Sequence, residues 1–371
     1  DENGEDIAEL DFRILTHTLE TNLEHQLSSE IEGSVGITGV YQNNRLLGRM
    51  FIPNYVLLGG EAFWIERWKR NKLEVEGGLR YDYRWVYSAR EERGIDIYSI
   101  RQFQSFSANV GAIYKFDPGL SARINLGRAW RPPHVNELFS AGLHHGAGAI
   151  EKGDSTLSAE QAMKLVGSLE VNKERVNAVI TLYQQWFPNF IYRKPGGIET
   201  TIRGAFPSFQ YAETSAMLSG ADVNLAFRPT PFLEWSGQGA YLRAWNTAED
   251  EPLIFMPANW IGNSLKFSLP DKGAFSQTYL KVRWRHVFEQ TLVPFSENPI
   301  ERDWRPPPAA YDLWGLDAGT FIRFGKQELS VIFSVDNFFN TVYRDYLNRF
   351  RYYADELGRN FSLRITYKFK H

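Results

Sequence analysis

Apolar and polar residues alternate along most of this chain with a period of two. From residue 73 to residue 85 every odd position is apolar, aromatic or glycine, and five of the even positions are charged. Because the side chains of a strand point alternately to opposite faces, this segment predicts a long strand with one apolar and one charged face. The same alternation recurs in about fifteen segments. The last of them places on one face Phe361, Leu363, Ile365, Tyr367 and Phe369.

Two kinds of connection join the predicted strands. Short turns rich in Asp, Gly and Pro alternate with long segments, a pattern typical of outer-membrane barrels, whose short turns are periplasmic and whose long loops are extracellular. We therefore predict an all-β fold, a transmembrane antiparallel up-and-down β-barrel, over residues 1–371. The long segments are expected at 42–56, 88–102, 131–157, 193–208, 246–257, 287–313 and 337–358.

The composition is compatible with a barrel that faces lipid. Aromatic residues make up 15% of the chain, although the mean hydropathy is only −0.37. A barrel exposes only alternate residues to lipid and carries aromatic girdles, so it needs no continuous apolar run. The net charge of −3 argues against nucleic-acid binding, and the absence of Cys excludes thiolate metal ligands. No Gly-x-Ser-x-Gly or His-Glu-x-x-His motif occurs, so we expect no enzyme.

Three histidines fall on predicted apolar faces. His17 and His25 belong to the first strand, and at the usual strand tilt their separation spans roughly 20 Å, close to the height of the apolar band. His286 follows Trp284 at the outer end of another strand. We interpret all three as residues of the membrane interfaces rather than as ligands.

Short motifs follow one another in a fixed order along the chain. They are Trp130-Arg131-Pro132-Pro133, Asn136-Glu137-Leu138-Phe139, Gly153-Asp154-Ser155-Thr156-Leu157 followed by Glu160, Asp336-Asn337-Phe338-Phe339-Asn340, and Gly358-Arg359-Asn360 before the closing strand. Together the motifs resemble the barrel segment of TonB-dependent outer-membrane receptors and transporters. The resemblance covers nearly the whole chain.

The resemblance implies a barrel of about 22 strands that encloses an N-terminal plug, in the outer membrane of a Gram-negative bacterium. We recognise no plug and no TonB box, and about seven strands too few. We therefore expect a companion segment, on this or a separate chain, that supplies the plug and the remaining strands. The implied partners are outer-membrane lipid, lipopolysaccharide, the TonB complex and the barrel assembly machinery. The assembly signal is expected at Tyr367 and Phe369, and whether Lys370 and His371 are native or part of a tag stays open.

Candidate ligand-binding residues gather in two of the long segments. Segment 131–157 contains His144, His145, Glu151 and Asp154. Imidazole and carboxylate together suit zinc, and imidazole suits haem iron, so His144 and His145 are candidate metal ligands. By contrast, His134, before a strand-like stretch from Val135 to Leu138, is expected to be structural.

Segment 337–358 contributes Arg344, Arg349 and Tyr346, which suit an anionic iron chelate. The favoured function is TonB-dependent active transport of a scarce metal complex, above all a ferric siderophore or related iron chelate. A zinc or haem receptor of the same family is one alternative, and a passive porin or structural barrel is another. Arg344, Arg349 and Tyr346 could equally bind lipopolysaccharide phosphates or fill space against the plug, and the histidines of segment 131–157 could instead hydrogen-bond neighbouring loops. We expect no tightly bound cofactor, because the metal complex is cargo.

Overall fold

The computed structural model describes residues 10–48, 51–92, 95–298, 303 and 305–369. The acidic start of the chain and the two residues Lys370 and His371 lie outside this part. Within it, no helix combines the length and the apolar character that crossing a membrane requires.

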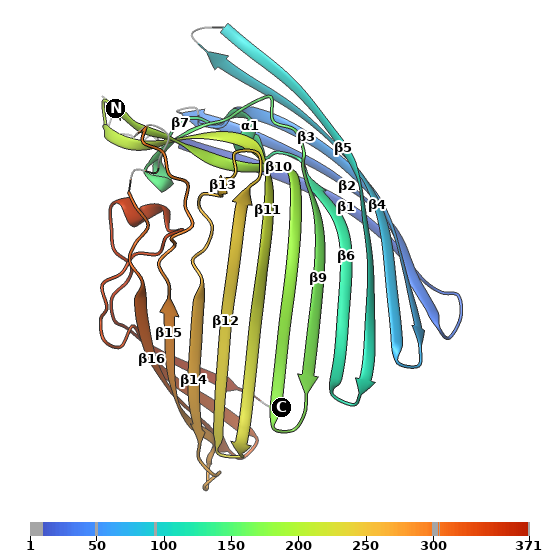
Figure 1. Cartoon of the computed structure of the whole chain (residues 1–371), viewed down its shortest axis with the longest axis vertical. Coiled ribbons are helices and arrows are strands. Elements are labelled where there is room, and N and C mark those ends of the chain that lie inside the picture. Colours follow the sequence, from blue (N-terminus) through green and yellow to red (C-terminus); the bar gives the residue numbers. More distant parts are fainter. Residues whose placement is uncertain (1–9, 49–50, 93–94, 299–302, 304, 370–371) are drawn as a thin grey trace.

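Eighteen strands of the described chain form one sheet (Figure 1). Three of them, β7 (Ala141–His144), β8 (Ala149–Lys152) and β13 (Glu251–Pro252), are short and lie in loops. Fifteen long strands remain, which confirms the number expected. They are β1 (Leu10–Gln26), β2 (Ile31–Gly48), β3 (Asn54–Arg70), β4 (Leu73–Glu92), β5 (Ile95–Asp117), β6 (Leu120–Arg131), β9 (Glu160–Asn172), β10 (Val176–Thr201), β11 (Gly204–Thr230), β12 (Leu233–Asn246), β14 (Trp260–Ser268), β15 (Phe275–Val287), β16 (Tyr311–Phe324), β17 (Gln327–Asp336) and β18 (Asn360–Lys368).

Each long strand pairs antiparallel with the next one along the chain, from β1 to β18. Among the described residues, β1 pairs only with β2, and β18 pairs only with β17. The result is a single curved wall with two open edges, the up-and-down order expected of a barrel.

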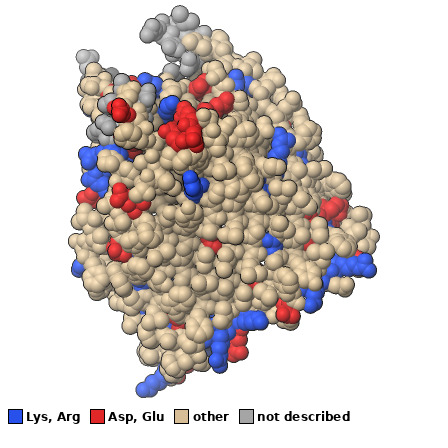
Figure 2. Space-filling model, in the orientation of Figure 1, with Lys and Arg blue, Asp and Glu red and all other residues tan. Residues whose placement is uncertain are grey.

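The outer face of the wall is apolar, as the alternation predicts. Register aligns Trp64 of β3 with Leu79 of β4 and Ala108 of β5. Leu79 is 54% exposed and Leu19 of β1 is 74% exposed. Many large side chains with such exposure suit contact with lipid, not water. In Figure 2 only single charged residues are scattered over the middle of the visible face, and Lys, Arg, Asp and Glu are denser toward its upper and lower ends.

The inner face carries ion pairs between neighbouring strands. Arg67 of β3 lies 2.6 Å from Glu76 of β4, and Arg283 of β15 lies 2.7 Å from Asp317 of β16. These pairs occupy the face opposite to Leu79, which is the charged lumen that the even positions of the segment 73–85 predict.

For three of the seven expected long loops the prediction is wrong. Segments 42–56, 88–102 and 193–208 consist mostly of strand, because the neighbouring strands remain paired almost to their tips. Above the membrane no lipid requires one apolar face, so the alternation fades there while the backbone ladder continues. The other four segments, 131–157, 246–257, 287–313 and 337–358, are loops between long strands.

The rims of the wall hold the interfacial histidines. Near the short turns, the carboxylate of Glu66 contacts His25 Nε2 at 2.6 Å and accepts a hydrogen bond from Trp64 Nε1 at 2.9 Å. At the loop end, Asp312 Oδ1 contacts His286 Nδ1 at 3.0 Å and accepts a hydrogen bond from Trp284 Nε1 at 2.8 Å. Both groups lie on the outer face, as predicted. His17 is also on this face, where its ring centroid lies 6.1 Å from that of Tyr41.

Candidate functional site

The loop between β6 and β9 folds over the upper end of the wall (Figure 1). Its first element is the helix α1 (Val135–Phe139), so the strand-like conformation predicted from Val135 to Leu138 is wrong. The Glu137 carboxylate accepts hydrogen bonds from the His134 backbone N–H and from Arg131 Nη1, both at 2.7 Å. These bonds close the first helical turn. His134 therefore starts a helix, in agreement with the structural role expected for it.

The carboxylate of Glu151 in β8 is the centre of the site. It is only 1% exposed. Its Oε1 lies 3.1 Å from His144 Nδ1 and accepts a hydrogen bond from Arg349 Nη1 at 2.9 Å. Its Oε2 accepts a hydrogen bond from the Tyr211 hydroxyl at 3.0 Å, and Arg193 Nη1 lies 3.8 Å from Oε1. A carboxylate can stay buried only when donors and cations surround it in this way.

The surrounding charges keep Glu151 ionised. Burial raises the pKa of Glu151, but the hydrogen bond from His144 and the charge of Arg349 outweigh it and hold the pKa below its ordinary value. Burial, together with the charge of Glu151, raises the pKa of Tyr211 to about 12, so its hydroxyl remains a donor. The cluster is thus a carboxylate held between donors.

His144 and His145 differ in their surroundings. The His144 ring stacks on Phe51 with centroids 4.8 Å apart, and its side chain is 37% exposed. Its Nδ1 lies 3.1 Å from Glu151 Oε1 and 3.3 Å from Arg349 Nη1, and a proton on Nδ1 would donate to Glu151. Nothing in the described chain hydrogen-bonds to Nε2. His145 is exposed at the start of a single 3-10 turn (His145–Ala147), and its imidazole makes no hydrogen bond or ion pair with described residues. The two rings do not converge, and the described ranges hold no group of three His, Cys, Asp or Glu arranged for a metal ion.

The remaining predicted site residues are engaged elsewhere. Asp154 Oδ1 accepts hydrogen bonds from the backbone and hydroxyl of Thr156 at 2.8 and 2.6 Å. Arg344 donates to Asp355 at 2.6 Å. Tyr346 is buried, with the Arg351 guanidinium 4.8 Å from its ring centre. Of the seven candidates, the structure therefore brings together His144, Glu151 and Arg349.

Comparison with known proteins identifies the family. The profile described as TonB dependent receptor-like, beta-barrel matches residues 12–367. The chain belongs to the TonB-dependent receptor family. This membership confirms the expected fold and outer-membrane location, and it agrees with the expectation that the chain is not an enzyme.

The names of individual relatives mention heme, copper and iron. The chain is 23% identical over 374 residues to TonB-dependent heme receptor A of Haemophilus influenzae, a match that covers 86% of this chain and 46% of the relative. Among solved structures, the copper transporter OprC matches with a TM-score of 0.77 at 18% identity, over 96% of this chain and 57% of that one. The FrpB iron transporter from Neisseria meningitidis matches with a TM-score of 0.69 at 15% identity, over 95% and 54%. The chain thus spans about half the length of these relatives.

The motifs that suggested the TonB-dependent receptor family contain residues that join the loops to the strands by hydrogen bonds. Arg131 donates to Glu137 at 2.7 Å and to Glu160 at 3.0 Å, so the first three motifs meet at one guanidinium. In the last loop Asn340 Oδ1 accepts a hydrogen bond from the Arg359 backbone at 2.9 Å. A Cβ at Gly358 would lie 2.6 Å from that oxygen, which explains the glycine.

Three residues of the site were not predicted: Phe51, Arg193 and Tyr211. Arg193 lies on the upper part of β10, where the sequence suggested a loop, and Tyr211 lies on β11 just beyond that expected loop. The one available signal was Glu151 itself, because a carboxylate that directly follows the apolar or small stretch Ala147–Ile150 needs cationic partners if it is buried. Glu151 alone does not indicate that its cationic partners are Arg193 and Arg349.

Proposed function

We propose that this chain is the C-terminal part of the barrel of an outer-membrane importer that takes up an iron complex and draws its energy from the TonB complex. Family membership and the heme, copper and iron receptors among the relatives support this proposal. Coupling to TonB would pass through a plug domain supplied by the companion segment. A closing strand that ends in Tyr367 and Phe369 would be read by the barrel assembly machinery.

The cargo that the site favours is haem, and the observation that carries this choice is the geometry of His144. Its Nδ1 is held by Glu151, and its Nε2 has no partner in the described chain. A carboxylate behind an imidazole fixes the ring and strengthens it as a ligand. Haem iron is commonly bound by a single such imidazole, whereas zinc sites take three or four protein ligands.

The same geometry weakens the sequence-based preference for an anionic siderophore. The sequence predicted that the chelate is bound by Arg344, Arg349 and Tyr346. In the structure all three side chains are engaged in contacts within and between the loops. A siderophore would have to break these contacts before it could bind. A ferric siderophore is therefore the second candidate.

Haemin titration of the complete receptor, purified with its plug, tests the choice of cargo. We expect a Soret shift in the wild type, at least a tenfold loss of affinity in His144→Ala, and no change in His145→Ala. The second variant is a matched control, since it removes the neighbouring exposed imidazole. Equal haemin affinity of all three proteins would contradict the role of His144.

Growth separates transport from binding. Deletion of the gene should abolish growth on haemin as the sole iron source, and the wild-type gene should restore it only in cells with TonB. Uptake that survives loss of TonB would instead favour a passive porin.

A further inference from the structure

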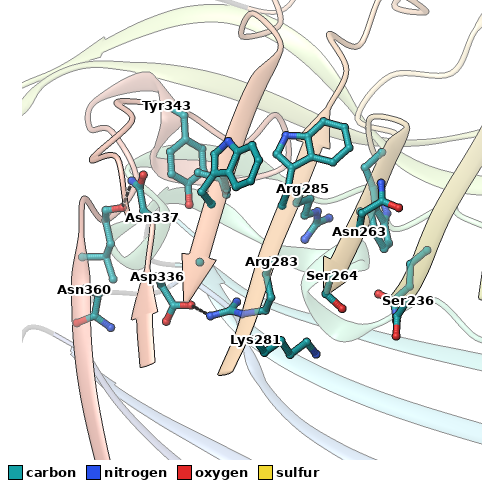
Figure 3. A pocket seen from close by; sticks show the side chains of 18 of the residues that line it. Ser236, Asn263, Ser264, Lys281, Arg283, Arg285, Asp336, Asn337, Tyr343 and Asn360 are labelled. Atoms are coloured by element: carbon teal, nitrogen blue, oxygen red, sulfur yellow. Dashed lines mark hydrogen bonds and ion pairs between the residues drawn. The ribbon is translucent and has the colours of Figure 1, made fainter. Parts of the chain in front are cut away.

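The wall has grooves on both of its faces. An inner, polar groove of about 550 Å³ lies along β14, β15 and β16 and is lined by Lys281, Arg283 and Arg285 (Figure 3). This groove opens toward the space in which a plug is expected, so a plug can fill it and its cations indicate no further ligand. A groove on the outer face needs another explanation, because the plug does not reach that face.

The outer groove has a volume of about 460 Å³ and crosses five neighbouring strands, β3 to β6 and β9. The side chains that line it include Trp64, Glu66, Leu79, Ala108, Val110, Leu126, Arg128 and Met163. The strands β2 and β10 flank it on either side. Strands added beside β1 or β18 would therefore leave it uncovered, and it faces lipid.

The groove exists because small residues lie beside large ones on the outer face. Register pairs Gly77 of β4 with Val110 of β5, and Ala108 of β5 with Leu79 of β4. A Cβ at Gly77 would have a single heavy atom within 4 Å, the carbonyl oxygen of Asn109 at 3.8 Å. The floor of the groove is thus open to an apolar chain from outside.

Arg128 brings a positive charge to one end of this apolar groove. It alternates along β6 with Ile124 and Leu126, which are both exposed, so it shares their outer face. Its Nη2 donates to Gln161 Oε1 at 2.8 Å, and it forms no ion pair with any residue that the structure describes. A guanidinium has several N–H donors, and a charge that faces lipid without a partner is destabilising. The groove therefore suits an anion that the described chain does not supply.

The position of Arg128 along β6 places this charge in the outer leaflet. Arg128 is eight residues beyond Leu120, where β6 begins after a short turn. At about 3.4 Å per residue and a strand tilt of about 40°, it lies roughly 20 Å above that turn, in the upper part of an apolar band about 25 Å tall. Long arginine side chains reach from such depths to the headgroups. The pairing of β5 with β6 also ends here, at Ala108 and Arg128.

The other end of the groove carries the opposite charge. Glu66 lines this end, and its carboxylate contacts His25 Nε2 at 2.6 Å and Trp64 Nε1 at 2.9 Å. An anionic headgroup therefore fits only beside Arg128, and an apolar chain attached to it would extend toward Trp64.

We propose that this groove binds lipid A, the membrane anchor of lipopolysaccharide, with a phosphate on Arg128 and an acyl chain along Ala108 and Gly77. In a Gram-negative outer membrane this lipid forms the outer leaflet, in which Arg128 lies. A guanidinium binds phosphate through paired, charge-assisted hydrogen bonds. The inference concerns lipid and not cargo, so it goes beyond the proposed import function and does not depend on it.

Binding of defined lipids to the complete receptor tests the groove. The receptor, purified in detergent with its companion segment, is titrated with bisphosphorylated lipid A, and bound lipid is measured by native mass spectrometry. We expect Arg128→Gln to weaken binding about tenfold or more through loss of the charge-assisted contacts. Gly77→Val should weaken it similarly, because the new side chain fills the floor of the groove and its Cβ meets no atom closer than 3.8 Å.

The matched controls are Arg243→Gln and Gly167→Val, two outward-facing positions outside the groove. Arg243 of β12 lies 4.9 Å from the centre of the Trp245 ring, and a Cβ at Gly167 of β9 would have no heavy atom within 4 Å. Both variants should bind lipid A like the wild type. Heat-dependent gel migration shows which variants fold, and Arg128→Gln decides the matter if Gly77→Val does not.

Several results would overturn the inference. They are wild-type affinity in Arg128→Gln, an equal loss of affinity in either control, and equal binding of lipid A without its phosphates. Phosphatidylglycerol that binds as tightly and displaces lipid A would contradict the choice of lipid A and assign the groove to a glycerophospholipid. The haemin titration succeeds or fails independently, because none of these variants touches His144.

Discussion

Arg349 and Glu151 are separated by 198 residues in the sequence and form an ion pair of 2.9 Å. Arg349 belongs to the loop between β17 and β18, and Glu151 to the loop between β6 and β9. The pair joins the two loops directly behind the His144 ring, so the position of that ring depends on both loops.

Removal of either partner should loosen both loops. Glu151→Ala leaves Arg193 and Arg349 without their shared carboxylate, and we expect a local cost of about 2–4 kcal/mol, since breaking a buried pair strands the remaining charge. Hydrogen exchange of residues 143–152 should accelerate accordingly. A double-mutant cycle with Arg349→Ala should show strong coupling, whereas Glu174→Gln in a short turn should change nothing. Additive effects of Glu151→Ala and Arg349→Ala would contradict direct pairing.

Acid should release the same loops. The pKa of Glu151 lies below its ordinary value of 4.5 in the folded protein, so its contribution is complete above pH 4.5 and is lost as the pH falls through the lowered pKa. Because the chain has no cysteine, His145→Cys offers a single labelling site for fluorescence anisotropy. Label mobility should rise as the pH falls below 4.5 and through the lowered pKa of Glu151. Glu151→Gln, which cannot titrate, should remove this transition, and a transition that persists in it would assign the effect to another group.

The guanidinium of Arg131 should hold the loop between β6 and β9 to the wall. Arg131→Ala leaves Glu137 and Glu160 without their common donor, and we expect about 2–3 kcal/mol of local destabilisation. Limited proteolysis within residues 132–159 should report it. Arg131→Lys should recover only part of the loss, because an ammonium cannot donate to both carboxylates with the planar fork of arginine. Full recovery by lysine would mean that charge alone matters.

Asn340 and Gly358 should depend on each other at the start of β18. Gly358→Ala places a Cβ against Asn340 Oδ1, so it should displace Asn340 and lower the fraction of folded barrel, measured by heat-dependent gel migration. Asn340→Gly keeps the backbone at positive φ but removes the hydrogen bond to Arg359, at a cost of about 1 kcal/mol. The double variant should be no worse than Gly358→Ala alone. A further loss in the double variant would show that the two residues act separately.

The membrane-spanning part of the fold could be predicted from the sequence because lipid imposes alternation there. In β4 the odd positions from Leu73 to Trp85 face lipid in the structure as they do in the pattern. Above the membrane this constraint ends. The residues around Pro195 and Gly196 were therefore interpreted as a loop, although β10 and β11 stay paired to a turn at Ile202 and Arg203.

The sequence allowed individual residues of the site to be predicted, but not that they lie together. His144, Glu151 and Arg349 were each chosen for their chemistry, but no local pattern shows that loops so distant in sequence meet. The helix α1 was not predicted, for a different reason. Five residues are too few for helical periodicity, and its first turn is capped by a hydrogen bond from the His134 backbone N–H to Glu137, with His in place of the usual Ser, Thr, Asp or Asn.

The two Trp–His–carboxylate groups at the rims have a consequence for how the wall sits in a bilayer. Each combines apolar rings with a polar hydrogen-bonded centre, so Glu66 and Asp312 favour the headgroup level at opposite leaflets. Their separation is fixed by the strands between them. A membrane of different hydrocarbon thickness would then have to deform locally, or the wall would have to tilt, at a cost that grows with hydrophobic mismatch. The height of the His144 ring above the lipid is set by the same two anchors.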